Sequence, residues 1–510
     1  MAETTTTSAS PLPSPDVAHR QSLRTFGQSR YAALKASRRR HGYFHRYLAR
    51  LVAHHVVPGS RVLDIGCAGG DMLAALKPSH GVGIDLNPAA IADARAKYPE
   101  LTFHDMAAED VARLAATPDA GPGFDYIILS GVLPQLYDLH TTLEALRTVC
   151  HERTRIIVCT FSRLWQPVIG LSEMTRLKAR VPDESWIPPY EVRSLLAQCD
   201  FSIITQKHNI LWPLGIPLLS NLVNRWIAPL PLINHLNLCT LTVARLLPRS
   251  NRLDTPKCVS IIVPARNESG NIKPLLDRIP LMGEKTEVIF IEGHSTDDTW
   301  ATIQKAVAEY NTAPVAGPGD PLTPRLALSC YQQTGRGKGD AVRLGFSKAT
   351  GGGGDILMIL DSDLSVPPEE LPRFVDLLAR HQCEFANGSR LVYPMDKHAM
   401  QTLNMIANKM FGWMFTYLLG QRIRDTLCGT KVLRREDYEK IAANRAYFGD
   451  FDPFGDFDLL FGAARLNLKI TDVPVHYKQR TYGSTNISRF RHGFMLLGMC
   501  AFAARKIKFI

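Results

Sequence analysis

The feature that most constrains the fold is a short apolar segment that ends in two acids. Residues 356–360 read ILMIL, and Asp361, Ser362 and Asp363 follow directly. An apolar run of this length predicts a buried strand, and open α/β sheets bind ligands at the carboxyl ends of their strands. Two carboxylates at such a position suit a hard cation that is shared with a diphosphate. The alternative is a helix N-cap, because residues 367–370 (PPEE) could begin a helix.

The acid pair belongs to an ordered series of motifs that extends from Cys258 towards the C-terminus. The other members are VSIIVPARNESGNI from Val259, VIFIEGHSTDDTW from Val288, GKGDA from Gly337, GSR from Gly388, DTLCGTKVLRRE from Asp425 and HYKQRTYGSTNI from His476. This series resembles the family 2 glycosyltransferases of GT-A fold, in particular the dolichyl- and polyprenyl-phosphate sugar transferases. The resemblance implies inverting transfer of a sugar from a nucleotide-sugar, with UDP or GDP as the nucleotide, and Mg²⁺ or Mn²⁺ at the acid pair.

The same resemblance implies roles for individual residues. Those expected to contact the nucleotide-sugar are Pro264, Arg266, Glu268, Glu292, Lys338, Asp361, Ser362, Arg390 and Arg480. Asp361 and Asp363 would hold the metal, and Asp363 would also be catalytic as the direct ligand. Asp425 is the second catalytic candidate, as a general base near the acceptor, although a phosphate acceptor needs little deprotonation. The acceptor would be a polyprenyl phosphate or another lipid-linked molecule; a soluble or polysaccharide acceptor is the alternative.

An earlier stretch carries a second kind of nucleotide pattern. Residues 61–65 (RVLDI) read as a buried strand followed by the glycine-rich GCAGGD, and residues 81–84 read as a second strand that ends in Asp85. Glycines let the backbone approach a ligand at a helix N-terminus, and an acid after the next strand accepts hydrogen bonds from ribose hydroxyls. The spacing fits NAD or S-adenosylmethionine, but the absence of G-x-G-x-x-G counts against a dinucleotide.

Four motifs from this stretch resemble class I S-adenosylmethionine-dependent methyltransferases: VLDIGCAGGDML, GIDLNPAAIADA, FHDMAAED and FDYIILSGVLPQL. The resemblance covers about residues 43–247. It implies that Asp64, Gly66 and Gly69 line the methionine end of the cofactor, that Asp85 holds the ribose, that Asp105 and Met106 flank the adenine, and that Ser130 ends the fourth strand. The family often has Asp-x-Leu-Glu-His where this chain has SGVLPQ, so the methyl acceptor stays open. An inactive module that localises the glycosyltransferase is the alternative.

Charge and cysteine usage restrict the partners. The chain of 510 residues has a net charge of +11 and ten cysteines. Residues 1–50 contain nine Lys/Arg and two Asp/Glu, and residues 473–510 contain seven Lys/Arg and no acid. Basic ends suit an anionic membrane surface or a phosphorylated substrate, and no nucleic-acid module is recognisable. The scattered cysteines predict neither a zinc site nor disulfides.

These patterns predict an α/β protein of two Rossmann-like domains. The expected divisions are a disordered tail at 1–28 without a signal peptide, a methyltransferase-like domain at 29–248, a linker at 249–257, a glycosyltransferase domain at 258–488 and a basic, apolar helix at 489–510. No apolar run is long enough to span a bilayer. The last helix could lie in a membrane interface or pack in the core. Residues 205–248 are apolar but proline-rich; we expect them to complete the first domain and close its active site, and contact with a membrane stays open as an alternative. We expect a cytoplasmic enzyme, peripheral at the inner face of the membrane.

Overall fold

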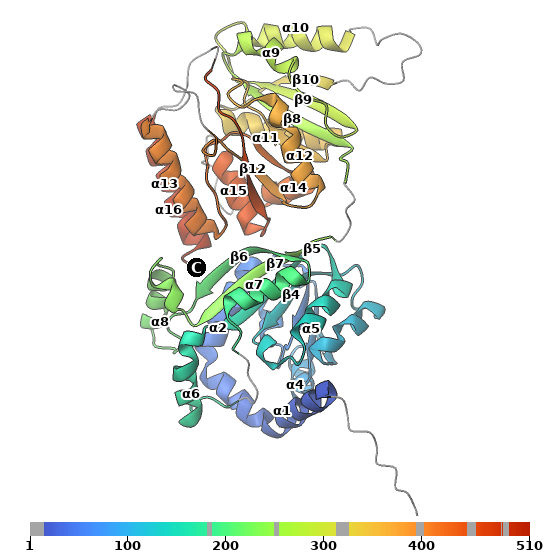
Figure 1. Ribbon diagram of the computed structural model, residues 1–510, viewed down its shortest axis with the longest axis vertical. Helices are drawn as coiled ribbons and strands as arrows, with labels where there is room; N and C mark the ends of the chain where they lie inside the picture. The colour runs from blue at the N-terminus through green and yellow to red at the C-terminus, as the bar shows by residue number, and fades with distance from the viewer. Residues whose placement is uncertain are drawn as a thin grey trace, which may run out of the picture. The chain divides into compact units, whose positions relative to one another are not determined.

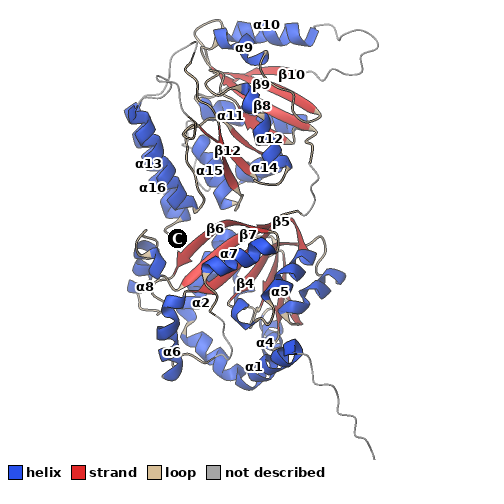
Figure 2. Cartoon of the chain, in the orientation of Figure 1, coloured by secondary structure: helices blue, strands red, loops and turns tan. Residues whose placement is uncertain are grey.

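The computed structural model describes residues 15–180, 186–248, 254–312, 326–393, 402–445, 455–480, 482 and 489–510. The chain divides into two compact units, residues 1–247 and 248–510 (Figure 1). Each unit contains a sheet of seven strands, with helices packed against it (Figure 2). The α/β fold class predicted from the sequence is therefore confirmed.

The sheet of the first unit is mostly parallel. Its strand order is β3-β2-β1-β4-β5-β7-β6, and its strands are β1 (Arg61–Ile65), β2 (His80–Asp85), β3 (Thr102–Asp105), β4 (Phe124–Ser130), β5 (Cys150–Phe161), β6 (Phe201–Asn209) and β7 (Cys239–Leu246). The first five strands are parallel, and β7 pairs antiparallel with both β5 and β6. Central strands such as β1 and β4 are nearly continuous apolar runs because helices cover both faces of a parallel sheet.

Helices of the first unit begin earlier in the chain than expected. They are α1 (Pro15–Arg40), α2 (Gly42–His55), α3 (Asp71–Ala75), α4 (Pro88–Lys97), α5 (Leu139–Leu146), α6 (Gln166–Met174), α7 (Pro189–Gln198) and α8 (Leu219–Leu222). The prediction of a disordered tail through residue 28 is wrong for residues 15–28, which are helical. Long-range ion pairs from Arg20 to Asp110 and from Arg24 to Asp105 hold this helix on the domain. Residues 1–14 lie outside the described part of the chain.

The second unit has a mixed sheet in the order β10-β9-β8-β11-β13-β12-β14. Its strands are β8 (Cys258–Ala265), β9 (Lys285–Glu292), β10 (Leu326–Gln332), β11 (Ile356–Ile359), β12 (Phe385–Ser389), β13 (Lys431–Arg434) and β14 (Ile470–Pro474). Strands β8 to β11 are parallel, while β13 runs antiparallel to both β11 and β12. Strand β12 therefore points the same way as β11. The carboxyl ends of β8, β9, β11 and β12 meet at one edge.

The helices of the second unit pack on both faces of this sheet. They are α9 (Ile272–Leu276), α10 (Thr299–Thr312), α11 (Lys338–Gly352), α12 (Pro372–Ala379), α13 (Thr402–Leu419), α14 (Arg435–Ala443), α15 (Asp456–Arg465) and α16 (Arg489–Ile507). Helix α16 buries Leu496, Met499 and Ala503 in the same core cluster as residues of α13 and α15, so one of its faces is a core face. Among the described helices, none has the length and apolarity needed to cross a membrane.

Candidate active sites

The strand ends of the first unit bring the predicted cofactor residues to one edge. Asp64 precedes the last residue of β1, Asp85 ends β2, Asp105 ends β3 and Ser130 ends β4. These four strands are parallel neighbours, so their carboxyl ends lie side by side. The loop that carries Gly66 and Gly69 and the residue Met106 follow directly from β1 and β3. The predicted set is therefore together in space, and its binding role stays a prediction.

Two glycines shape the loop after β1 in different ways. Gly66 has φ +75°, and a Cβ there would approach Val132 to 3.0 Å. Its left-handed backbone favours glycine for the turn itself. At Gly69 a Cβ would meet no described atom closer than 3.8 Å, which is ordinary van der Waals contact. A side chain at Gly69 would therefore begin in contact with Asp93 and Asp71, and glycine keeps the backbone of this loop accessible to a ligand.

Two acids of this edge, the buried Asp64 and the partly buried Asp85, have different partners. Asp85 accepts hydrogen bonds from the backbone N–H groups of Ala68 and Asn87, both at 2.8 Å, and burial raises its pKa. Asp64 is 2% exposed, and no described residue donates a hydrogen bond to its Oδ2. Burial raises the pKa of Asp64 to about 7, although the charge of Arg38 opposes that rise. A buried acceptor without a donor fits a ligand that supplies its own donors.

Helix α1 also contributes to this edge, which the sequence motifs did not indicate. Arg24 forms an ion pair with the exposed Asp105, and His19 Nε2 lies 3.0 Å from the carbonyl oxygen of Gln135, beyond the end of β4. Gly27 packs against the Asn87 side chain after β2. Helix α1 thus runs along the residues that follow three strands of the edge. No local signal in its own sequence marks those contacts.

In the second unit, the first acid of the pair is paired with the predicted lysine. Lys338 is the first residue of α11, and its Nζ lies 2.6 Å from Asp361 Oδ1. Burial would lower the pKa of Lys338, but Asp361 and Asp456 raise it well above its usual value. A Cβ at Gly429, in the loop that begins at Asp425, would clash with both Asp361 and Lys338. That loop therefore packs directly on the pair, and any larger residue at position 429 would have to displace Asp361 and Lys338.

The second acid of the pair is matched with an arginine. Asp363 Oδ2 lies 2.6 Å from Arg480 Nη2, and Arg480 Nη1 lies 3.9 Å from Glu268 Oε1. Burial raises the pKa of Glu268 to about 7, and the charge of Asp363 contributes to that rise. Between the two acids, Ser362 is buried and donates to the carbonyl oxygen of Pro264 at 3.0 Å. The backbone of β8 thus fixes the turn that presents both carboxylates.

The ends of β9 and β10 carry the predicted acid Glu292, which is buried, and a glutamine, Gln333, that sequence reasoning missed. Glu292 accepts hydrogen bonds from Ser295 N at 2.5 Å and from Gln332 Nε2 at 3.1 Å. Gln333 follows β10, is 5% exposed, and has an Oε1 atom with no partner among the described residues. Its amide would lie 3.6 Å from a Cβ at Gly293. Arg266 is exposed beside the same glycine. A carboxamide in this position can read a nucleobase edge.

Asp425 does not have the surroundings of a general base. Its carboxylate is fully buried and accepts hydrogen bonds from Arg390 N, Nε and Nη2 at 3.0, 2.8 and 2.9 Å. Asn408 Nδ2 donates at 2.7 Å, and the backbone N–H groups of Leu427 and Cys428 donate at 3.0 and 3.1 Å. Burial would raise the pKa of Asp425, but Arg390 and these hydrogen bonds lower it to about 2. The predicted general-base role does not fit this geometry, in which Asp425 positions Arg390.

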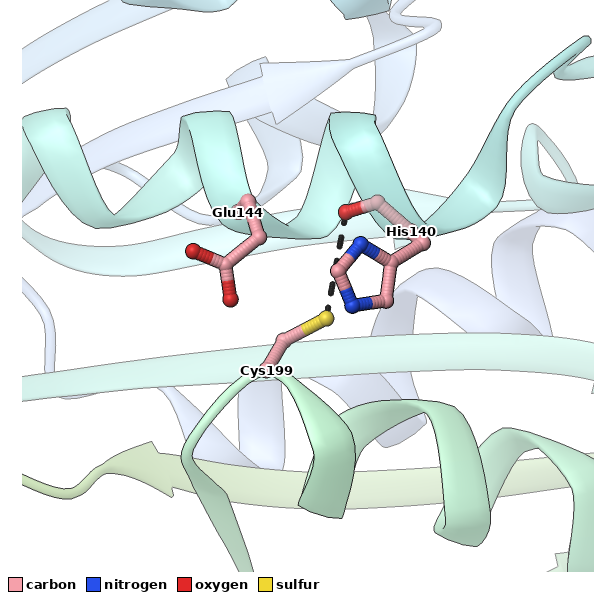
Figure 3. Close-up of side chains that lie close together, drawn as sticks. All are labelled: His140, Glu144 and Cys199. Atoms are coloured by element: carbon pink, nitrogen blue, oxygen red, sulfur yellow. Dashed lines mark hydrogen bonds between the residues drawn. The ribbon is translucent and has the colours of Figure 1, made fainter.

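Another cluster joins α5 to the end of α7, away from the strand ends described above. Side-chain ligand atoms of His140, Glu144 and Cys199 lie within 4.8 Å of one another (Figure 3). The thiol of Cys199 donates to the carbonyl oxygen of His140 at 3.8 Å. No motif predicts this group, because Cys199 lies far from the other two residues along the chain. The thiol contact links the two helices.

Family models match one domain in each unit. Residues 63–156 match the model described as "Methyltransferase domain", and residues 260–442 match "Glycosyl transferase family 2". Curated relatives match part of the chain. The undecaprenyl-phosphate 4-deoxy-4-formamido-L-arabinose transferase of Yersinia pestis (strain Pestoides F) is 26% identical over 46% of this chain and 64% of the relative. Its counterpart in Enterobacter sp. (strain 638) is 24% identical over 46% and 63%. The chain thus spans less than two thirds of these relatives.

Two kinds of solved structure are similar to this chain, each over less than half of it. Magnesium protoporphyrin IX methyltransferase from Synechocystis PCC 6803 is 16% identical, with a TM-score of 0.31 over 45% of this chain and 99% of its own. Glucosyl-3-phosphoglycerate synthase from Mycobacterium tuberculosis, in complex with Mn²⁺ and UDP, is 18% identical, with a TM-score of 0.33 over 49% and 80%. The two family models are what identify the domains, and they bear out both resemblances stated from the motifs. The chain therefore carries a methyltransferase domain followed by a family 2 glycosyltransferase domain, both of them domains of enzymes.

Proposed function

We propose that the second unit transfers a sugar from a UDP- or GDP-sugar to a polyprenyl phosphate or another membrane-associated acceptor. The observation that carries this proposal is the acid pair at the end of β11, in which Asp361 and Asp363 are each matched with a cation. Carboxylate oxygens are the donors that Mg²⁺ and Mn²⁺ take beside substrate phosphates. The donor set therefore fits a divalent cation held by Asp361 and Asp363. That cation would act as a Lewis acid on the leaving diphosphate.

The residues of the chain itself would bind the donor and balance its charge. Lys338 and Arg480 neutralise the acid pair in the structure as it stands. Both can turn to phosphate oxygens when the donor binds, because guanidinium and ammonium groups bind phosphates well. Lys338 opens α11, and a helix N-terminus adds partial positive charge there. Gln333 and Glu292, at the ends of β10 and β9, would hold the base and ribose.

A phosphate acceptor suits this site better than a hydroxyl acceptor. A hydroxyl nucleophile needs a general base, and Asp425 is instead held by Arg390 through a bidentate ion pair. A phosphate oxygen is already an anion at neutral pH, so it can attack without deprotonation. Arg390 lies after β12, at the same edge as the acid pair, and would bind that acceptor phosphate. The curated relatives, which are named for undecaprenyl phosphate, point to the same acceptor class.

The second unit also has a surface suited to reach a lipid acceptor. Apolar side chains are exposed along α13 and on the outer face of α16: Ile406, Met410, Trp413, Phe494 and Leu497. Helices α13 and α16 pack against each other through residues of one core cluster. Such a face, with Arg505 and Lys506 at the end of α16, suits shallow insertion into an interface. We propose peripheral binding at the inner face of the cytoplasmic membrane. The flanking side chains of Arg489 and Arg491, part of the sequence prediction, lie outside those described.

For the first unit we propose binding of S-adenosylmethionine and methyl transfer. The Asp64 oxygen without a described donor supports a ligand with its own donors, and the glycine at position 69 supports a close approach of that ligand to the backbone. Asp64, Gly66 and Gly69 would surround the methionine end. Asp85, held by two backbone N–H groups, would take the ribose hydroxyls. Asp105, Met106 and Ser130 would complete the site at the ends of β3 and β4.

Thermal shift of the full chain against a panel of nucleotide-sugars, with and without Mn²⁺, tests the donor half without any acceptor. We expect one UDP- or GDP-sugar to raise the midpoint only with metal, and Gln333→Leu to reduce the shift without altering the unliganded midpoint. The same donor with polyprenyl phosphate should then yield a lipid-linked sugar. Transfer to a soluble glycan but not to the lipid phosphate would reject the acceptor. S-adenosylmethionine should raise a separate transition; if it does not, the first unit is an inactive module.

A further inference from the structure

Two segments of the first unit leave an unusual number of apolar side chains in solvent. We call residues 162–180 and 210–238 together the apolar rim. The first follows β5 and contains α6, and the second connects β6 to β7 and contains α8. All nine residues of α6 are described and none of them is buried. The exposed apolar side chains of the rim are Leu164, Val168, Leu171, Met174, Leu177, Leu214, Ile216, Leu218, Leu219, Leu222, Trp226, Leu230, Leu232 and Leu236.

Strand register places the rim at the same edge as the cofactor residues. Strand β5 is parallel to β4, with Ser130 opposite Cys159. Phe161, the last residue of β5, pairs with Cys239 of β7, and Cys239 pairs with Asn209, the last residue of β6. Both rim segments therefore leave the sheet where β4 presents Ser130. A molecule that covers the rim also lies beside the predicted methyl donor.

Hydrogen bonds make the two segments one surface. Trp165 Nε1 donates to the carbonyl oxygen of Leu236 at 2.8 Å. The junction of α1 and α2 contacts both segments (Figure 2), because Arg40 Nη1 donates to the carbonyl oxygen of Leu177 at 3.0 Å and Tyr43 donates to Asn221 at 3.2 Å. Asn224 is buried and donates to Trp212 O at 2.7 Å and to Tyr43 at 3.1 Å. Polar contacts beneath the leucines thus hold the rim in shape.

The charged side chains of the rim are almost all basic. Its two segments contain Arg163, Arg176, Lys178, Arg180 and Arg225 and a single acid, Glu173, which is paired with Lys178. Arg40, which contacts the rim, belongs to a run of three arginines. The guanidinium of Arg225 lies 5.6 Å from the ring of Trp226. Leucines beside basic residues and a tryptophan match the layers of an anionic bilayer surface, where acyl chains lie beneath negatively charged headgroups.

We propose that the apolar rim docks on an anionic lipid surface and that the methyl acceptor of the first unit is a lipid-linked molecule. The second half rests on the S-adenosylmethionine binding proposed above. In the transfer, the methyl group leaves the sulfonium sulfur, which keeps the electrons of the broken C–S bond. The acceptor oxygen or nitrogen forms the new bond and releases its proton to solvent. Docking brings the acceptor headgroup to the carboxyl edge of the sheet while its lipid stays in the bilayer.

Vesicle flotation of the full chain tests the docking. The test variant is Leu171→Glu/Leu232→Glu, with one exposed leucine from each segment; Leu232 is 90% exposed, so the fold loses no core contact. We expect the variant to bind phosphatidylcholine–phosphatidylglycerol vesicles at least about tenfold more weakly than wild type. The conservative Leu171→Met/Leu232→Met and the matched Leu281→Glu, an exposed leucine of the second unit, should bind as wild type does. Binding by wild type should weaken in high salt and without phosphatidylglycerol.

Three outcomes would overturn the docking half. One is equal flotation of wild type and Leu171→Glu/Leu232→Glu. Another is equal binding to vesicles with and without anionic lipid. The third is a wild-type dimer in solution that Leu171→Glu/Leu232→Glu converts to a monomer, because the rim would then be covered by a second copy of the chain.

The acceptor half is tested with S-adenosylmethionine that carries a labelled methyl group, added to the full chain with a membrane lipid extract in the same vesicles. With wild type we expect the labelled methyl group in the organic phase. With Leu171→Glu/Leu232→Glu we expect no label there, although calorimetry should show an unchanged affinity for S-adenosylmethionine. Label confined to aqueous products, or no lipid label although the cofactor binds, would overturn the lipid-linked acceptor. If wild type does not bind S-adenosylmethionine, the proposed methyltransferase function fails, and flotation still decides whether the rim docks.

Discussion

Asp64 and Asp361 occupy comparable positions in the two units, but their electrostatic surroundings are opposite. Each lies at the carboxyl end of a central parallel strand, β1 for Asp64 and β11 for Asp361. Burial disfavours the charge of both. At Asp361 the ion pair with Lys338 reverses that effect and lowers its pKa. At Asp64 burial prevails and raises the pKa to about 7.

This difference indicates which ligand charge each edge is built to bind. The second unit supplies cations next to its acids, so a ligand that brings negative phosphates and a metal can exchange partners with Lys338 and Arg480 without leaving a charge unpaired. The first unit offers Asp64 an oxygen without a hydrogen bond from any described residue. A ligand for that edge must bring donors or positive charge itself. S-adenosylmethionine, with its ammonium, sulfonium and ribose hydroxyls, meets that requirement.

Asp363→Asn would remove a negative charge from the proposed metal site of the second unit. We expect this substitution to have the largest effect on activity. The substitution keeps the size of the side chain, but it weakens metal binding and the stabilisation of the leaving diphosphate. Turnover of the sugar transfer should fall by about a hundred- to a thousandfold. The measurement is initial rate with saturating donor and metal, after circular dichroism has shown an intact fold.

Asp376→Asn, on the exposed side of α12, provides a matched control that should leave turnover unchanged. Excess EDTA should abolish the wild-type activity, and Mn²⁺ or Mg²⁺ should restore it. Near-normal turnover of a folded Asp363→Asn protein, or full activity in EDTA, would reject metal binding by Asp361 and Asp363. The alternative, that the acid pair caps a helix, would then be favoured.

Asp85→Ala would test the proposed cofactor site of the first unit. The carboxylate is oriented by the N–H groups of Ala68 and Asn87, so its removal leaves ribose hydroxyls without acceptors. We expect a loss of roughly 1–3 kcal/mol in binding free energy, which is about five- to 150-fold in affinity for S-adenosylmethionine. Calorimetry measures it, with the exposed Glu100→Ala as control. Equal affinities for wild type and Asp85→Ala would reject the ribose assignment.

The sequence predicted the fold and the strand ends because both depend on local signals. Apolar runs followed by glycines or acids mark the carboxyl ends of β1, β2 and β11 without knowledge of any long-range contact. The order of those motifs was enough to recognise both domains, and the family models agree. The fold class and the enzyme class were therefore predictable, as was the grouping of residues such as Asp64 and Asp85 at one edge.

What the sequence did not reveal depends on partners far apart in the chain. From its motif alone, Asp425 could be a free acid. Only the fold shows that Arg390 and Asn408 donate hydrogen bonds to its carboxylate. Residues 15–28 read as a polar tail, although Arg24 reaches Asp105 across the domain. Gln333 has no motif at all; it is recognisable only because its buried oxygen lacks a described partner. In each case the sequence identifies the residue, but its role depends on contacts with residues that are distant in the chain.

Asp64→Asn should change the stability of the first unit in a way that depends on pH. An acid whose pKa is raised in the folded state stabilises the fold while it is protonated, below about pH 4. That contribution is lost as pH rises through about 7, because the native state must then bury a charge. Asparagine mimics the protonated acid. We expect the transition that S-adenosylmethionine shifts to lie at a higher temperature in Asp64→Asn than in wild type at pH 8, with little difference at pH 4. A variant less stable than wild type at pH 8 would contradict the buried, unpartnered carboxylate.

Asp105→Asn should have the smallest effect, because Asp105 is exposed to solvent whereas Asp64 is buried. Asp105 is exposed at the end of β3, and its partner Arg24 is also partly in solvent. Exposed ion pairs contribute about 0–1 kcal/mol, so the stability of the first unit should change little. If Asp105 only flanks the adenine, affinity for S-adenosylmethionine should fall by less than about fivefold, since the amide keeps one acceptor oxygen. Arg24→Gln provides the matched change on the other partner. If affinity for S-adenosylmethionine falls as much in Asp105→Asn as in Asp85→Ala, the charged carboxylate of Asp105 itself binds the cofactor. The first unit would then use the charge of an acid to bind its ligand, as the second unit does.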